Sequence, residues 1–143
     1  MIEYQKILDK NMINVFKDIL KNIRDDGLSK NNHLYITFLT NHKNVELPNW
    51  LKLKYPQEMT IIIQYEYYNL EIHKNNFSIT LSFGDIKTDL KIDFNAIVSF
   101  ADPSANFGLI LQKDKIQKGV NKKLEMNKSK KNNVINFSNY KKN

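Results

Sequence analysis

The sequence predicts a mainly β protein with one N-terminal helix (class α+β), folded as a small antiparallel sandwich or partly open barrel that carries a flexible C-terminal tail. Three observations predict this class. Apolar residues follow helical spacing near the N-terminus, alternate with polar residues in short runs between residues 33 and 111, and thin out after Gln112. With 143 residues, 41% of them hydrophobic, the chain has the size of one domain with a modest core.

Residues 3–25 are expected to form the helix. At about 100° per residue its apolar positions cover a sector of roughly 160°, which is wider than a one-sided surface helix needs. Two interpretations stay open: the helix is sunk deeply into its own core, or it packs on its own sheet and also on a second copy of the chain. The residues assigned to such a dimer interface are Leu8, Met12, Val15, Phe16 and Ile19.

About six short strands should follow the helix. Alternation of apolar and polar residues places them at 34–38, 59–68, 77–83, 86–94, 96–100 and 107–111. In the long run at 59–68, one face would carry Thr60, Ile62, Gln64, Glu66 and Tyr68. Residues 48–58, bounded by Pro48 and Pro56, read as a turn-rich excursion, and residues 73–76 and the pair Gly84-Asp85 read as hairpin turns.

The charge divides the chain into two parts. Residues 1–112 hold 12 basic and 13 acidic residues, a net charge of −1, whereas residues 113–143 hold 10 Lys and 2 acids, a net charge of +8. A basic tail can bind nucleic acid or acidic surfaces by counterion release, and it can equally be a solvated linker in a Lys-rich chain. We therefore divide the chain into a folded domain at 1–112, a flexible Lys/Asn-rich linker at 113–133 and a terminal segment at 134–143.

The last segment contains an apolar cluster beyond the polar linker. Val134, Ile135, Phe137 and Tyr140 precede Lys141 and Lys142. One interpretation is a short linear motif that docks on a partner, and the other is a strand that folds back onto the domain. The N-terminus lacks a basic region leading into an apolar run, and no segment approaches the ~20 apolar residues of a membrane span, so we expect a cytoplasmic protein.

The sequence contains no motif or spacing typical of a catalytic or metal-binding site. The chain has no cysteine, which excludes disulfides and thiolate chemistry, and His33, His42 and His73 are not at ligand spacing to one another. The adjacent pair Asp25-Asp26 closes the helix, and Asp85, Asp89 and Asp93 fall at the charged positions of a strand or its flanks, where a surface role is expected. No cofactor and no enzymatic activity are predicted, and binding becomes the default function.

Four segments resemble the stringent starvation protein B family (SspB), in its short alphaproteobacterial form. They read HLYITFLT (33–40), YPQEMTIIIQYEYYNLEI (55–72), FSITLSFGDI (77–86) and FADPSANFGLIL (100–111). The ending VINFSNYKKN (134–143) is similar to the family's ClpX-binding motif. Asp85 departs from the pattern, because the family commonly has a second glycine after Phe83-Gly84.

The resemblance implies a non-enzymatic adaptor of the ClpXP protease. Such proteins bind the ssrA tag of stalled translation products, dimerise through the N-terminal helix and dock on the N-terminal domain of ClpX through the tail. Ile62, Gln64, Glu66 and Tyr68 would share one shallow peptide-binding surface with Thr80, Ser82 and Gly84 if their strands are neighbours. Gln64 matches the glutamine that the family uses for the tag. Thr80 and Ser82 can instead be ordinary solvent-facing residues, and Tyr68 an aromatic covering the core.

The partner-docking residues implied by the resemblance are Val134, Ile135, Phe137, Tyr140, Lys141 and Lys142. The alternative function is a small-barrel protein that binds RNA or single-stranded nucleic acid with its basic tail. The near-neutral domain disfavours this alternative, because the charge lies off the barrel.

Overall fold

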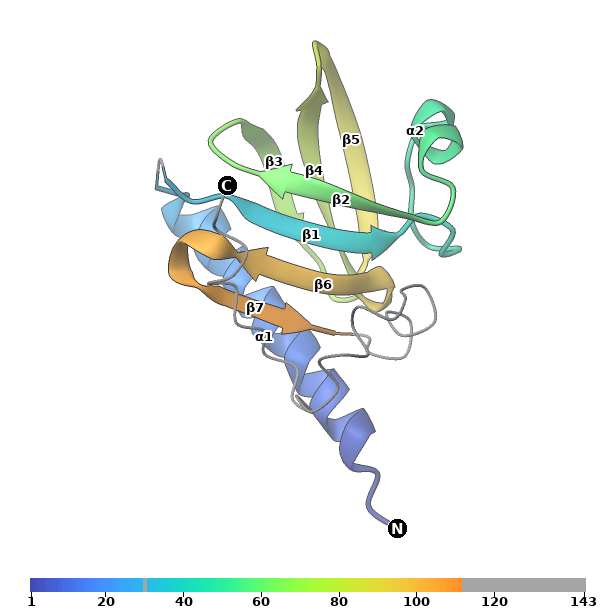
Figure 1. Cartoon of the computed structure of the whole chain (residues 1–143), viewed down its shortest axis with the longest axis vertical. Helices are drawn as coiled ribbons and strands as arrows, with labels where there is room; N and C mark the ends of the chain where they lie inside the picture. The colour runs from blue at the N-terminus through green and yellow to red at the C-terminus, as the bar shows by residue number, and fades with distance from the viewer. Residues whose placement is uncertain (30, 112–143) are drawn as a thin grey trace.

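A computed structural model describes residues 1–29 and 31–111. A long helix, α1, is followed by strands and short helical segments in an order that Figure 1 traces along the chain. The elements are α1 (Tyr4–Asp26), β1 (Leu34–Leu39), α2 (Asn49–Lys54), β2 (Glu58–Ile63), β3 (Tyr67–Ile72), β4 (Asn76–Phe83), β5 (Ile86–Asp93), η1 (Phe94–Ala96), β6 (Ile97–Asp102), η2 (Pro103–Ala105) and β7 (Phe107–Ile110). The expectations on residues 112–143 lie outside the described residues.

The strands form two antiparallel sheets around one hydrophobic core. One sheet has the order β2-β1-β6-β7 and the other the order β3-β4-β5, and all their pairings are antiparallel. Figure 1 shows the three-stranded sheet crossing steeply behind β1 and β2, while α1 runs behind the other part of the four-stranded sheet. This arrangement confirms the predicted α+β class, and the two sheets do not close into a complete barrel.

Helix α1 uses one side of its apolar sector for the core. Phe16, Leu20 and Ile23 are buried, and the ring of Phe16 makes edge contacts with three core aromatics, Phe77, Phe94 and Phe100. Phe16 therefore packs inside its own subunit, contrary to its assignment to a dimer interface. The rest of the sector remains at the surface, since Leu8 and Val15 are each 37% exposed and Met12 and Ile19 are only partly buried.

The predicted continuous strand at 59–68 is wrong. The chain leaves the four-stranded sheet after Ile63, bends at Gln64 and Tyr65, and enters the three-stranded sheet at Tyr67. Met59, Ile61 and Ile63 face the core as expected. The break cannot be seen in the sequence. Apolar and polar residues alternate in the same way on both sides of the bend, because both strands point their apolar residues into the same core.

Two further expectations are corrected. Residues 49–54 form the short helix α2 rather than a turn, beginning after Pro48 and anchored by the buried side chain of Leu51. Asp93 is not a surface residue but is 7% exposed, because its carboxylate accepts hydrogen bonds from the backbone N–H of Asn95 at 2.7 Å and from the side-chain amide of Asn44 at 3.2 Å. Asp93 thereby begins η1 in the manner of an N-terminal capping residue.

The expected hairpin turns are both present. His73 donates its N–H to the C=O of Asn76 at 2.8 Å between β3 and β4. Gly84 and Asp85 connect β4 to β5, with Phe83 opposite Ile86, and Gly84 has φ +65°. Asp85 is not among the residues with positive φ, so only the first turn position demands glycine. Aspartate is therefore compatible with this hairpin at the place where the family commonly has a second glycine.

Candidate functional site

The predicted peptide-binding residues fall on two sheets and on the bend between them. Ile62 is on β2, Gln64 and Glu66 are in the bend, Tyr68 is on β3, Thr80 and Ser82 are on β4, and Gly84 is in the hairpin. One shared surface required the strand that carries these residues to neighbour β4. This condition is met only by β3, where Tyr68 lies opposite Thr80, because β2 belongs to the other sheet. Ile62 points away from the core on the four-stranded sheet, and Thr80 and Ser82 point away from it on the three-stranded sheet, so they lie on opposite sides of the sandwich.

The outer face of the three-stranded sheet carries a cross-strand row of polar and aromatic residues. Tyr68, Thr80 and Asp89 are register partners on β3, β4 and β5. The hydroxyl of Thr80 donates to the Asp89 carboxylate at 2.6 Å and accepts from the Asn69 amide at 3.4 Å. Thr80 is only 7% exposed and its hydroxyl bonds to residues on both neighbouring strands, so it is not an ordinary solvent-facing residue.

A lysine covers the aromatic end of this row. The ammonium of Lys87 lies 4.3 Å from the centroid of the Tyr68 ring, a cation–π contact across β3 and β5. Lys87 is also the register partner of Ser82. The outer face near the hairpin therefore presents an amphipathic surface made of Tyr68, Ser82 and Lys87.

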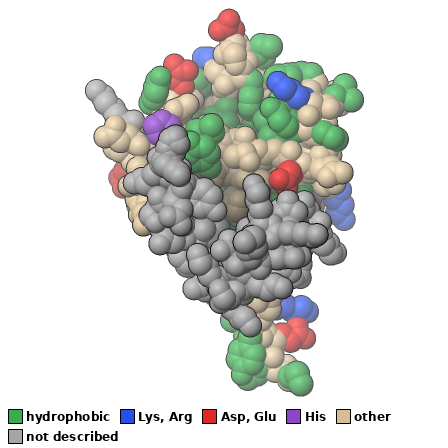
Figure 2. Space-filling model, in the orientation of Figure 1, with side chains coloured by type: hydrophobic (Ala, Val, Ile, Leu, Met, Phe, Trp, Pro, Cys, Tyr) green, Lys and Arg blue, Asp and Glu red, His purple; other side chains and the backbone are tan. Residues whose placement is uncertain are grey.

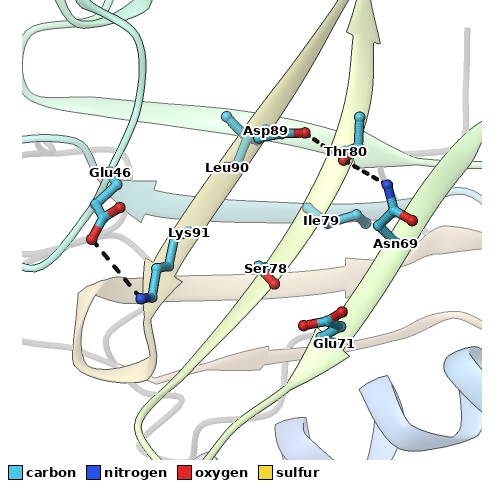
Figure 3. Close-up of a pocket in the computed structure, with 9 residues that line it drawn as sticks. All are labelled: Glu46, Asn69, Glu71, Ser78, Ile79, Thr80, Asp89, Leu90 and Lys91. Carbon is cyan, nitrogen blue, oxygen red and sulfur yellow. Dashed lines mark hydrogen bonds and ion pairs between the residues drawn. The ribbon is translucent and has the colours of Figure 1, made fainter.

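A shallow cavity of about 330 Å³ lies further along the same face (Figure 3). Its lining holds three carboxylates, of Glu46, Glu71 and Asp89, against one ammonium, that of Lys91. Glu46 pairs with Lys91 through two backbone hydrogen bonds of 2.8 and 3.1 Å, and their side chains are 4.0 Å apart. The cavity is thus a polar surface of mostly negative charge, and of the predicted peptide-binding residues it includes only Thr80.

The cavity borders an irregularity in the sheet. The register between β3 and β4 shifts by one residue between Tyr68 and Glu71, which is a β-bulge, and Asn69 in the bulge has φ +56°. Asparagine tolerates this left-handed conformation better than most residues. The bulge directs the Asn69 amide onto Thr80, as the sticks in Figure 3 show.

An apolar patch at the hairpin was not anticipated as part of the site. The ring of Trp50 on α2 contacts that of Phe83 on β4, with centroids 6.2 Å apart and planes at 84°. Trp50 is 42% exposed and Ile86, opposite Phe83, is 56% exposed. We call Trp50, Phe83 and Ile86 the hairpin patch. Figure 2 shows hydrophobic side chains over the upper part of the view, where Figure 1 places α2 and the hairpin.

Within residues 1–29 and 31–111, no cluster of three or more histidine or acidic side chains has the geometry to hold a metal ion. The pair Asp25-Asp26 is exposed at the end of α1, where a hydrogen bond from the Arg24 guanidinium lowers the pKa of Asp25. Among the described helices, none is both long and apolar enough to cross a bilayer.

A comparison with models of protein families shows the family to which this chain belongs. A family model described as stringent starvation protein B matches residues 7–142, which is nearly the entire chain. The chain belongs to the SspB family. A search of curated proteins finds no match. SspB is a family of ClpXP adaptors that are generally non-enzymatic, so the chain's role is that of an adaptor. The match also extends through the Lys- and Asn-rich residues 113–133 and through every residue of 134–143 except the last.

Proposed function

We propose that this protein binds ssrA-tagged polypeptides through its folded domain and delivers them to ClpXP through its C-terminal tail, without catalysing a reaction itself. The observation that carries the proposal is the family match over residues 7–142, because it spans both the domain and the tail that the two tasks require. Both ClpXP delivery and the tagging of stalled products take place in the cytoplasm, which is where we place the protein.

The geometry near the β4–β5 hairpin supports peptide binding. β3 begins at Tyr67, opposite Leu81, so the bend with Gln64 and Glu66 approaches the end of β4 that carries Ser82 and Gly84. The hairpin patch adds exposed aromatic and aliphatic surface at the same end. An extended peptide needs such a combination of polar groups that fix its register and apolar surface that contributes burial. Ile62 and Thr80 are the members of the predicted set that lie away from this end or are engaged within the sheet.

Dimerisation through α1 is the second part of the proposal. Leu8, Met12, Val15 and Ile19 lie within about 60° of one another on the helix, at about 100° per residue, next to the stripe that Phe16 begins on the core side. The N-terminal end of α1 projects beyond the sheets in Figure 1 and carries hydrophobic side chains at its tip in Figure 2. A dimer would bury this face and would hold two tag sites and two tails together.

The tail is the third part. Val134, Ile135, Phe137 and Tyr140 would dock on the N-terminal domain of ClpX by burying apolar surface, and Lys141 and Lys142 would add electrostatic attraction. Residues 113–133, as a flexible linker, would span roughly 25 Å on average. Such a tether keeps a bound substrate near the unfoldase at an effective concentration of about millimolar.

The test is fluorescence anisotropy of a labelled ssrA-tag peptide with the full-length protein over a series of salt concentrations. We expect saturable binding, and we expect Gln64→Ala to weaken it about ten-fold, because the side-chain amide supplies hydrogen bonds to the peptide backbone. Gln57→Ala is the matched control, since Gln57 is exposed and lies before β2. No binding of the peptide would refute the proposal, and unchanged affinity of Gln64→Ala would remove Gln64 from the site. A labelled RNA measured in parallel tests the nucleic-acid alternative, which predicts RNA binding that falls steeply with salt.

A further inference from the structure

The outer face of the four-stranded sheet carries two rows of uncharged residues. Each row runs through register partners on β2, β1, β6 and β7. The first row is Ile62, Tyr35, Ala101 and Gly108, and the second row is Thr60, Thr37, Ser99 and Ile110. Both rows face away from the core, because the residues that alternate with them along the strands belong to the core.

The outer face of the three-stranded sheet has a different composition. Its register rows carry four charged side chains, those of Glu71, Lys87, Asp89 and Lys91. An antiparallel sheet that faces water normally presents polar and charged residues on that side, and only the three-stranded sheet follows this pattern. In Figure 1, the other described strands and both α-helices lie behind or beside the four-stranded sheet, so they do not cover its two uncharged rows.

A glycine in the first row indicates that another segment approaches this face closely. Gly108 is not among the glycines with positive φ, and the ladder between β6 and β7 has no register shift. Neither the backbone conformation nor a bulge therefore requires glycine at this position. The remaining use of a glycine inside a strand is to let a ligand or another backbone come near. With Ala101 beside it, Gly108 leaves space next to the larger side chains of Tyr35 and Ile62.

The chain itself contains an apolar segment that can reach this face. β7 is an edge strand of the same sheet, and the described chain ends at Leu111, directly after it. Residues 112–133 separate Leu111 from the terminal segment 134–143 and its apolar residues. A random coil of this length spans roughly 25 Å, whereas four strands side by side are about 14 Å across. The net charges of −1 on residues 1–112 and +8 on residues 113–143 also attract each other.

Tethering makes a weak contact sufficient. A linker of this kind holds its end near the domain at an effective concentration of about millimolar. If the separate segment bound with a dissociation constant of about 1 mM, the tethered segment would therefore occupy the face about half of the time. A contact of this strength needs only a few apolar side chains, and a partner that binds the segment more tightly displaces it.

We propose that the terminal segment, residues 134–143, docks on the outer face of the four-stranded sheet of its own chain, with apolar side chains over Ala101 and Gly108 beside Tyr35 and Ile62. The docked segment is not available to a partner. This consequence, though not the docking itself, rests on the proposed function: the segment would exchange between the sheet and the N-terminal domain of ClpX, so the domain would limit how often its own tail is free to bind.

The first measurement uses a nitroxide spin label on the terminal segment of the full-length protein. The sequence has no cysteine, so Asn143→Cys provides a single attachment site. The label broadens the amide NMR signals of residues close to it. We expect the signals of Tyr35 and Ala101 to be lost, while those of Ser78 and Lys91, on the outer face of the other sheet, keep their intensity. Equal broadening on both faces, or loss on the three-stranded sheet alone, would overturn the docking.

A mixed sample tests whether the segment comes from the same chain. Isotope-labelled protein without nitroxide is mixed with nitroxide-labelled protein at natural isotope abundance. We expect the isotope-labelled chain to keep its Tyr35 and Ala101 signals. Their loss in this sample would assign the face to the segment of a second copy, which overturns docking within one chain.

Two pairs of variants of the spin-labelled full-length protein test both sides of the contact. Phe137→Ser removes an aromatic ring from the segment, and Asn136→Ser is its control. Ile62→Lys adds a charge to the first row, and Ser78→Lys adds the same charge to the outer face of the other sheet. We expect Phe137→Ser and Ile62→Lys to restore the lost signals and the two controls to leave them lost. Signals that stay lost in both test variants would overturn the docking, and melting temperatures show that each variant folds.

The regulatory consequence is measured as binding of the full-length protein, without spin label, to the isolated N-terminal domain of ClpX. If docking occupies the segment about half of the time, its release in Ile62→Lys should tighten the apparent affinity about two-fold relative to the wild type and to Ser78→Lys. Unchanged affinity would overturn the regulation. If the wild type does not bind the ClpX domain at all, the tail's part in the proposed function fails, whereas the docking is decided by the nitroxide measurement alone.

Discussion

Single buried polar side chains fix the local structure at positions where the alternation of apolar and polar residues does not predict it. Asp93 occupies a position that alternation assigns to the surface, but its carboxylate bonds to Asn44 and to the backbone of Asn95 within a nearly closed environment. Thr80 similarly lies beneath its neighbours because Asn69 and Asp89 both bond to its hydroxyl. Both side chains have their hydrogen bonds made within the fold, which offsets the cost of burying them.

Asp93→Ala should therefore destabilise the domain. The change removes the cap of η1 and leaves the Asn44 amide without its carboxylate, and together these losses should lower the free energy of unfolding by about 1–3 kcal/mol. Urea denaturation of the full-length protein measures it. Asp18→Ala is the control, because Asp18 is exposed on α1 and should change stability by no more than about 0.5 kcal/mol. Equal stability of the two variants would show that the Asp93 contacts contribute little.

A helix or strand was predictable where its apolar residues keep one spacing, helical or alternating, from its first residue to its last. Spacing alone located α1, and the alternation predicted at 77–83 and 86–94 located β4 and β5 with their hairpin. It failed at 59–68, because a bend between two sheets leaves the alternation almost unbroken. The neighbours of a strand depend on contacts between distant residues, so the division of the predicted site between β2 and β4 could not be read from either strand. Trp50 was missed because its segment read as a turn.

The exposed apolar face of helix α1 allows a test of the proposed dimer. Val15→Glu and Leu8→Glu place charge on the exposed stripe, where a desolvated carboxylate would oppose association without disturbing the core. We expect light scattering to give the mass of two chains for the wild type and of one chain, 16.9 kDa, for these variants. Asn14→Glu adds the same charge to a different face of α1 and should remain dimeric.

Phe16→Ala distinguishes the two faces of the helix. Since Phe16 is fully buried against three aromatic rings, we expect its loss to cost about 3–5 kcal/mol of folding stability.

Two results of the light-scattering measurement would contradict the proposed dimer. A wild-type protein with the mass of one chain would refute it, and charged variants at Leu8 and Val15 that keep the dimeric mass would place the interface elsewhere.

At the scale of the whole molecule, the separation of charge matches the proposed division of tag binding and ClpX docking between the domain and the tail. The domain is close to neutral and the basic residues are concentrated after Gln112. A near-neutral domain can bind its ligand by hydrogen bonds and burial with modest dependence on salt, whereas a basic tail can speed its encounter with an acidic partner surface. Tag binding and delivery should accordingly respond differently to ionic strength and to changes in the tail.

Removal of residues 134–143 tests this division directly. The shortened chain keeps the bend, the hairpin and β2, so it should bind the tag peptide with the affinity of the full-length protein. It should lose stimulated degradation of a tagged substrate by ClpXP, because the bound substrate is no longer tethered near the unfoldase and the gain in effective concentration disappears. A synthetic peptide of residues 134–143 should inhibit delivery by the full-length protein without displacing the tag. Normal delivery by the shortened chain would show that the tail is not the docking element, and reduced tag affinity would show that the terminal segment contributes to the domain instead.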